Sequence, residues 1–195
     1  MFVDHFANPG SGWETAPLPS GTTFAYGADD YIVVARGALH HFSYSPYTQP
    51  IQQLNTSMTA TQSAGPPSGA GFGLVCRRGV GTAEIQYEFL VLGRTWVVER
   101  RNGESTNSAP AILLQGKSPV APGAIPITVG AMCATEGDGR TTRLVLFLNG
   151  TKVADLPNVA PTFQDTGWRS GIDVASGAAP STVTVSEFEE RDLAL

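Results

Sequence analysis

Five polar residues in the middle of the chain have the types and spacing of a ligand-binding surface: Arg77, Gln86, Glu88, Glu99 and Arg101. They lie on segments that alternate polar and apolar residues, and side chains two apart on a strand share a face. If these segments are neighbouring strands, the five side chains would therefore lie close together on one face. Planar guanidinium and carboxylate groups make paired hydrogen bonds, so the set predicts a carbohydrate-binding groove. The alternative is the solvated face of an ordinary sheet, with cross-strand pairs such as Glu88 with Arg101.

Aromatic residues near this set have less certain roles. Tyr87 and Trp96 have the opposite parity to Glu88 and Glu99, which predicts that they face the core. Trp13 and Trp168 lie in Gly-containing loops, where an aromatic side chain either contacts a ligand or packs the loop onto the sheet. Packing is the commoner role, and we expect it here. The Tyr-Ser-Pro-Tyr segment at 44–47 is ambiguous.

Carboxylate pairs suggest a second chemistry. Retaining glycosidases place two carboxyl groups about 5 Å apart, and those built on β-sandwiches commonly use a Glu-x-Asp-x-x-Glu strand. No such motif occurs here. The nearest approximations are Glu84 with Glu88 and Glu187 with Glu189, and same-face carboxylates on a strand are more often simply solvated. A hydrolase that uses Glu84 and Glu88, or Glu99, is the alternative function.

The two cysteines, Cys76 and Cys133, each share an alternation face with apolar residues, which places both in the core: Phe72 and Leu74 for the first, Ile127 and Val129 for the second. They are either a disulfide or two buried free thiols. A disulfide would close a loop of nearly sixty residues and stabilise the fold by ~4 kcal/mol. Extracytoplasmic localisation follows only from the paired form.

The regular elements are all short strands separated by Gly, Pro, Asn and Ser. Asn149-Gly150 between two apolar runs predicts a type I′ hairpin. The expected strands are Phe2–Phe6, Thr23–Tyr26, Tyr31–Ala35, Ala38–Tyr44, Gln52–Gln62, Gly71–Arg78, Ala83–Leu92, Thr95–Arg101, Ala111–Leu114, Ile127–Glu136, Arg143–Leu148, Thr151–Leu156, Gly171–Ala175 and Thr182–Glu189. This number of strands predicts an all-β fold, a two-sheet antiparallel β-sandwich, with the first and last strands side by side.

Composition limits the remaining possibilities. The 195 residues fit one domain (1–195), and 42% hydrophobic residues suffice for a full core. A net charge of −5, without a Lys/Arg cluster, argues against nucleic acid. The longest apolar runs are far shorter than the roughly 20 residues of a membrane span. The N-terminus does not resemble a signal peptide, so the chain is expected to be cytosolic or to follow a leader, anchor or upstream domain.

Several segments resemble the concanavalin A-like lectin/glucanase (LamG-like) jelly rolls of bacterial secreted and extracytoplasmic proteins. The matching segments are Asp4-His5-Phe6-Ala7-Asn8-Pro9-Gly10-Ser11-Gly12-Trp13, Gly71-Phe72-Gly73-Leu74-Val75-Cys76-Arg77, Glu84-Ile85-Gln86-Tyr87-Glu88-Phe89, Leu146-Phe147-Leu148-Asn149-Gly150-Thr151-Lys152-Val153, Ser170-Gly171-Ile172-Asp173-Val174 and Val183-Thr184-Val185-Ser186-Glu187-Phe188-Glu189. The resemblance covers nearly the whole chain. It implies a concanavalin A-like jelly roll in an extracytoplasmic or secreted protein, but its motifs are structural and specify function weakly.

Such jelly rolls sometimes hold calcium near their first and last strands. Asp4 and Glu187 are the expected metal ligands, with Asp29 and Asp30 as further oxygen donors, although no loop has the dense Asp/Asn spacing of a dedicated Ca²⁺ site. The adjacent His40-His41 would point to opposite faces of a strand and cannot chelate one ion together. Two Cys without His at ligand spacing indicate no zinc site.

Three functions follow. The leading expectation is a non-catalytic binding or sensor domain whose partner is carbohydrate or a cell-surface glycan. The alternatives are the hydrolase above and a structural module with a protein partner.

Overall fold

The structure is a computed structural model that describes residues 1–37, 40–47, 51–63, 69–78, 84–102, 109–120, 123, 125–159 and 167–193. Its strands are β1 (Phe2–Asp4), β2 (Thr23–Tyr26), β3 (Tyr31–Ala35), β4 (His40–Tyr44), β5 (Gln53–Gln62), β6 (Gly71–Arg78), β7 (Ile85–Leu92), β8 (Thr95–Asn102), β9 (Ala111–Lys117), β10 (Ile127–Thr135), β11 (Thr142–Leu148), β12 (Thr151–Val159), β13 (Arg169–Ala175) and β14 (Ser181–Asp192). Over the described ranges, no helix is long and apolar enough to cross a membrane.

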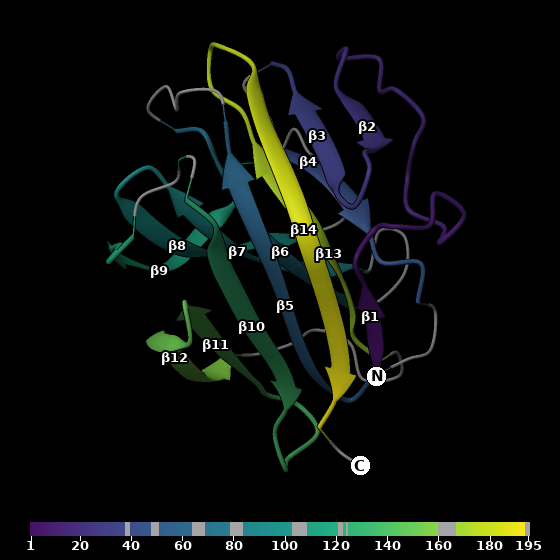
Figure 1. The fold of residues 1–195 in the computed structure, drawn as a ribbon. Helices are drawn as coiled ribbons and strands as arrows, with labels where there is room; N and C mark the ends of the chain where they lie inside the picture. Colours follow the sequence, from purple (N-terminus) through teal and green to yellow (C-terminus); the bar gives the residue numbers. More distant parts are fainter. Residues whose placement is uncertain are drawn as a thin grey trace.

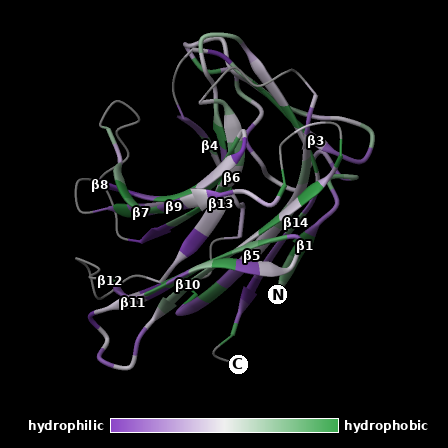
Figure 2. Ribbon diagram, turned by 90° about the vertical axis from the view of Figure 1, so that its left-hand side faces the viewer, coloured by the Kyte–Doolittle hydropathy of each residue, from purple (hydrophilic) through white to green (hydrophobic). Residues whose placement is uncertain are grey.

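Two antiparallel sheets pack as layers (Figures 1 and 2), which confirms the predicted β-sandwich. The eight-stranded sheet has the order β12-β11-β10-β5-β14-β3-β2, with β1 also paired to β14. The six-stranded sheet has the order β4-β13-β6-β7-β8-β9. The expected pairing of the first and last strands is confirmed, because Phe2 lies opposite Glu190 and Asp4 opposite Phe188.

Local sequence explains these elements. Burial alternates along all ten residues of β5, as expected of a strand with one face on the core. The β11–β12 hairpin turns at Asn149 and Gly150, whose φ angles of 48° and 76° are those of a type I′ turn. Gly and Asn adopt this left-handed conformation more readily than other residues.

The core lies between the sheets and contains Tyr87 and Trp96, as their parity predicts, together with Trp13 and Trp168. Trp13 and Trp168 are therefore packing residues. A disulfide joins Cys76 on β6 to Cys133 on β10. Since these strands belong to different sheets, the bond links the two layers across the core.

Asp4 organises the N-terminal segment. Its Oδ1 accepts a hydrogen bond from the Phe6 backbone N–H at 2.7 Å, and its Oδ2 accepts one from Trp13 Nε1 at 3.0 Å. The ring centroids of Phe6 and Trp13 lie 5.5 Å apart, and both rings pack on Tyr31. The opening motif of the sequence therefore has a structural role.

Candidate functional site

All five predicted ligand-binding residues lie on the outer face of the six-stranded sheet, which points away from the core. Gln86 on β7 is opposite Arg77 on β6 and Arg101 on β8. Glu88 is opposite Glu99. Antiparallel pairing of β6, β7 and β8 thus brings the set together, as the alternation predicts.

The face is buried, and the expectation of a solvated one is wrong. The exposed fractions are 0% for Gln86 and Glu88, 2% for Arg101 and 6% for Glu99. Only the Arg77 side chain, 18% exposed, remains partly accessible. Long polar side chains on adjacent strands pair with one another here. Four of the five residues of the predicted groove are therefore buried, and their role in ligand binding stays a prediction.

Arg101 and Glu88 form a buried ion pair at the centre of this face. Arg101 Nε donates to Glu88 Oε1 at 2.8 Å, and Arg101 Nη2 donates to Glu88 Oε2 at 3.3 Å. Burial, followed by the nearby Asp173 carboxylate, raises the pKa of Glu88 to about 7, against the opposing effect of Arg101. The pair fixes the Glu88 carboxylate in one orientation.

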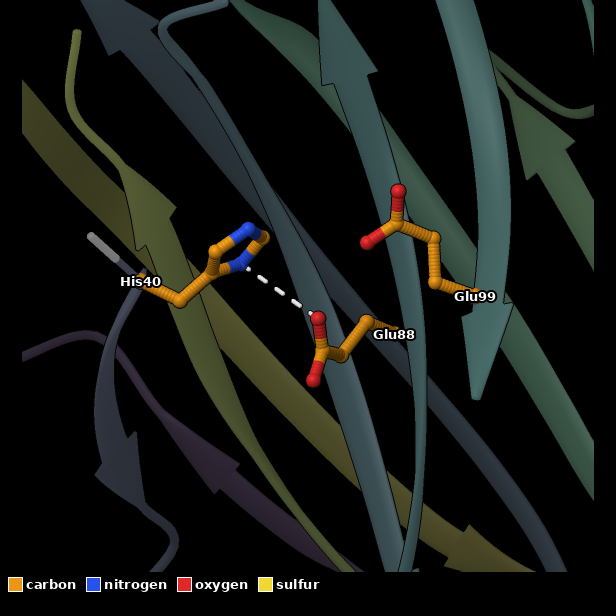
Figure 3. A group of neighbouring side chains, drawn as sticks. All are labelled: His40, Glu88 and Glu99. Atoms are coloured by element: carbon orange, nitrogen blue, oxygen red, sulfur yellow. Dashed lines mark ion pairs between the residues drawn. The ribbon is translucent and has the colours of Figure 1, made fainter. Parts of the chain in front are cut away.

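His40 lies beside two carboxylates from other strands, and Figure 3 shows the one that belongs to Glu88. His40 Nδ1 lies 3.0 Å from Asp173 Oδ2 on β13 and 3.3 Å from Glu88 Oε2. Burial opposes protonation of the ring, but Asp173 and Glu88 outweigh it and raise the pKa of His40 to about 9. The imidazolium is thus the favoured form at neutral pH.

Glu99 and Asp173 complete what we call the charged cluster, defined as His40, Glu88, Glu99, Arg101 and Asp173. Burial raises the pKa of Glu99 as well. Glu99 Oε2 and Asp173 Oδ1 are buried and have no hydrogen-bond partner in the described part of the chain. A buried polar atom in this state is costly. The cluster therefore has unused capacity to bind a positively charged or hydrogen-bonding group.

Three rings on the edge strand β4 form what we call the aromatic strip: His40, Phe42 and Tyr44. Successive ring centroids are 6.2 and 6.1 Å apart, with ring planes 29° and 22° from parallel. All three residues are half-buried. The guanidinium carbon of Arg77 lies 3.7 Å from the centroid of Tyr44. The Tyr44 hydroxyl donates to Gln86 Oε1 at 3.2 Å, which connects the strip to the buried face.

Two glycines on β6 allow this strand to approach β7 closely. A Cβ on Gly73 would lie 1.8 Å from the backbone oxygen of Phe89, and one on Gly71 would lie 1.9 Å from that of Val91. Gly73 is also the cross-strand neighbour of Asp173. The Gly71-Phe72-Gly73 motif thus leaves Asp173 without a side chain beside it on that strand.

The structure does not bring Asp4 and Glu187 together. Asp4 is 8% exposed and uses both oxygens in the hydrogen bonds described above. The side chain of Glu187 is 46% exposed and lies 3.7 Å from that of His5. Adjacent residues on β14 point to opposite faces, and Phe188 is the one opposite Asp4. Asp4 is therefore held within the N-terminal segment while Glu187 lies beside His5, and calcium binding at the pair stays a prediction.

Sequence reasoning missed His40 and Asp173 as members of the site. It correctly separates the two histidines: His41 is buried on the other face, with Nε2 2.9 Å from the Arg36 carbonyl oxygen. Two signals were available in the sequence. Asp173 is a charge between Ile172 and Val174, and His40, Phe42 and Tyr44 share one parity. Neither signal predicts that β4 pairs with β13, which is the pairing that brings the two residues together.

No family model matches the chain, and no curated protein sequence is similar to it. Solved structures do share its fold. The potassium-bound carbohydrate recognition domain of Emp46p has a TM-score of 0.68 at 9% identity, over 92% of this chain and 88% of that one. The Bacillus subtilis carbohydrate-binding module CBM66 has a TM-score of 0.60 at 18% identity, over 91% and 95%.

A third similar structure is the GH16 protein of a Bacteroides ovatus mixed-linkage glucan locus, in complex with a G4G4G3G product. Its TM-score is 0.65 at 9% identity, over 97% of this chain and 99% of that one. At these identities the similarity concerns the fold. Together with the two-sheet topology, it shows that the chain has the jelly-roll β-sandwich fold of these lectin, carbohydrate-binding-module and GH16 structures.

Proposed function

We propose that this chain is a carbohydrate-binding domain whose ligand lies on the outer face of the six-stranded sheet, along the aromatic strip. The observation that carries the proposal is the row of half-buried rings on β4 with the Arg77 guanidinium beside it. Aromatic faces pack on the apolar faces of sugar rings, and a planar guanidinium donates paired hydrogen bonds to neighbouring hydroxyls. The strip on β4 and Arg77 on β6 together offer both contacts.

Buried polar side chains hold two members of the strip in place. Gln86 holds the Tyr44 hydroxyl, and Asp173 holds the His40 ring. Binding groups are most selective when neighbouring residues fix their orientation. The structural neighbours include a carbohydrate recognition domain and a carbohydrate-binding module, which supports the same class of ligand.

A glycan array of the folded chain, with and without calcium, tests the proposal, and titration of each positive glycan gives its affinity. We expect Phe42→Ala to weaken binding about tenfold, the equivalent of one lost stacking contact. Ile125→Ala, which shortens a side chain that is 78% exposed, is the matched apolar control. Binding that is unchanged in Phe42→Ala would exclude the aromatic strip, and silence across the array would favour a protein-interaction role.

Arg77→Ala tests the polar half of the surface. We expect it to weaken glycan binding without unfolding the chain, because Arg77 is partly accessible and its ion pair with Glu84 is a loose one at 3.5 Å. Arg143→Ala is the matched control, since Arg143 is paired with Asp155 on the other sheet. Equal affinities of the two variants would remove Arg77 from the site.

One observation favours a glycoside hydrolase as a second candidate. Glu88 and Glu99 face each other across β7 and β8, and oxygens of the two carboxylates lie within 4.8 Å. That separation is similar to the spacing of about 5 Å in retaining glycosidases. Glu84 and Glu88, four residues apart, would be separated by about 13 Å along a strand, too far for that chemistry. Reducing-sugar release that disappears in Glu99→Gln would establish the hydrolase.

We also infer that the domain functions outside the cytoplasm. The disulfide between the sheets is of a kind that persists in oxidising compartments and is rare in the cytosol. Fractionation of the producing cells with free-thiol labelling tests this. A cytosolic chain with two reduced thiols would contradict it.

A further inference from the structure

We propose that His40, Glu88 and Glu99 bind a first-row divalent transition-metal ion of the Zn²⁺ type on the outer face of the six-stranded sheet. Figure 3 shows the three side chains converging from separate strands, with the Glu99 carboxylate directed toward the histidine ring. One ligand atom from each of the three residues can be chosen so that all lie within 4.8 Å of one another. The proposal concerns the metal alone and does not depend on carbohydrate binding.

The spacing of the ligand atoms fits a small cation. In tetrahedral coordination, bonds of about 2.0–2.1 Å place neighbouring ligand atoms about 3.3 Å apart. His40 Nδ1 and Glu88 Oε2 are already 3.3 Å apart. Glu99 is the ligand that must approach. Its Oε2 makes no hydrogen bond in the described residues, so none has to be broken.

Two unpartnered oxygens leave the cluster able to accept a further positive charge. Glu99 is 94% buried and Asp173 completely buried, yet each keeps one carboxylate oxygen without a hydrogen-bond partner in the described ranges. A metal ion displaces the proton from His40 Nδ1, and the three carboxylates and one guanidinium then give the charged cluster a formal charge of −2. A divalent cation cancels that charge. Buried charges without such compensation are strongly unfavourable.

The donor set selects the kind of ion. Ca²⁺ takes six to eight oxygen ligands, which this site does not offer. One imidazole and two carboxylates are typical ligands of Zn²⁺ and its neighbours in the first transition row. Metal binding at His40 Nδ1 displaces the proton that this nitrogen shares with Asp173 Oδ2, 3.0 Å away, in the metal-free chain. Three protein ligands leave a fourth position open.

The experiment uses the disulfide-bonded chain of 195 residues and Zn²⁺ alone. After treatment with chelator, calorimetric titration should give one Zn²⁺ per chain. At a Zn²⁺ concentration a hundredfold above the Kd, we expect the Tm to rise by about 5–10 °C. Ca²⁺ at the same concentration should leave the Tm unchanged.

Two variants remove one ligand each. Glu99→Gln keeps the size of the side chain, and His40→Gln removes the nitrogen ligand, so either can report if the other fails to fold without metal. Each should weaken Zn²⁺ binding at least tenfold. The matched control is the double variant His5→Gln/Glu187→Gln, which removes an exposed histidine–carboxylate pair from the other sheet. It should bind Zn²⁺ within twofold of the unmodified chain.

Three results would overturn the proposal: no saturable Zn²⁺ binding, equal affinity in the folded Glu99→Gln and His40→Gln variants, or loss of binding in the control. The last result would assign the metal to an adventitious surface site. A visible Co²⁺ spectrum that disappears in Glu99→Gln but not in the control would support the assignment independently of stability.

Discussion

The cross-link between the sheets should be a large single contribution to stability. The cysteines are 57 residues apart in sequence, and closing a loop of that length removes unfolded-state entropy equivalent to about 4 kcal/mol. For a chain of 195 residues, an unfolding entropy of about 2.1 cal/mol/K per residue sums to about 0.4 kcal/mol/K. We therefore expect reduction of Cys76–Cys133 to lower the Tm by about 10 °C.

The assay is thermal unfolding of the same chain in oxidised and reduced form, followed by circular dichroism. Both sulfurs belong to fully buried residues, so reduction requires unfolding in reductant followed by refolding. The control is Cys76→Ala/Cys133→Ala, whose Tm should not respond to reductant. A difference of less than about 2 °C between the oxidised and reduced chains would refute the loop-entropy argument.

Three further predictions concern single positions. Arg101→Met should cost about 3–5 kcal/mol because it leaves the Glu88 carboxylate buried without its partner, and Glu88→Leu in the same chain should restore much of the loss, measured by urea unfolding. Gly73→Ala should destabilise by about 3 kcal/mol or more, since its Cβ would overlap a neighbouring backbone oxygen, whereas Gly137→Ala should be nearly neutral because that position is open. Burial raises the pKa of Glu190, more than Ser45 and Ser170 lower it, so the folded state favours its protonated form. Protonated Glu190 therefore stabilises the folded state. This stabilisation is lost as the pH rises from the unfolded-state pKa of about 4.3 through the folded-state pKa, by up to about 1.4 kcal/mol per pH unit, and Glu190→Gln should remove the dependence.

Each of these predictions has a contrary outcome. A double variant no more stable than Arg101→Met would mean that the charge pair is not the reason for the loss. Equal stability of the two glycine variants would contradict the close strand approach. A Glu190→Gln chain with an unchanged stability–pH profile from pH 4 to 8 would assign that slope to other groups.

Much of the fold follows from local patterns. Period-two alternation predicts the strands at Thr23–Tyr26, Tyr31–Ala35 and Gly71–Arg78 with the bounds that the structure has. Asn149-Gly150 predicts its turn because few other residue pairs tolerate two positive φ angles. Parity also places both cysteines in the core, where the structure joins them. The starts of two expected strands, at Ala38 and at Ala83, lie outside the described residues.

The site depended on contacts that no local pattern contains. The sequence by itself determined which residues share a face of each strand, because side-chain direction alternates along any extended backbone. It did not determine which strands are neighbours. His40 and Asp173 are 133 residues apart and meet only because β4 pairs with β13. Burial of Glu88 and Glu99 likewise exists only in the folded chain, so tertiary structure alone turned an alternating polar face into a buried charged cluster.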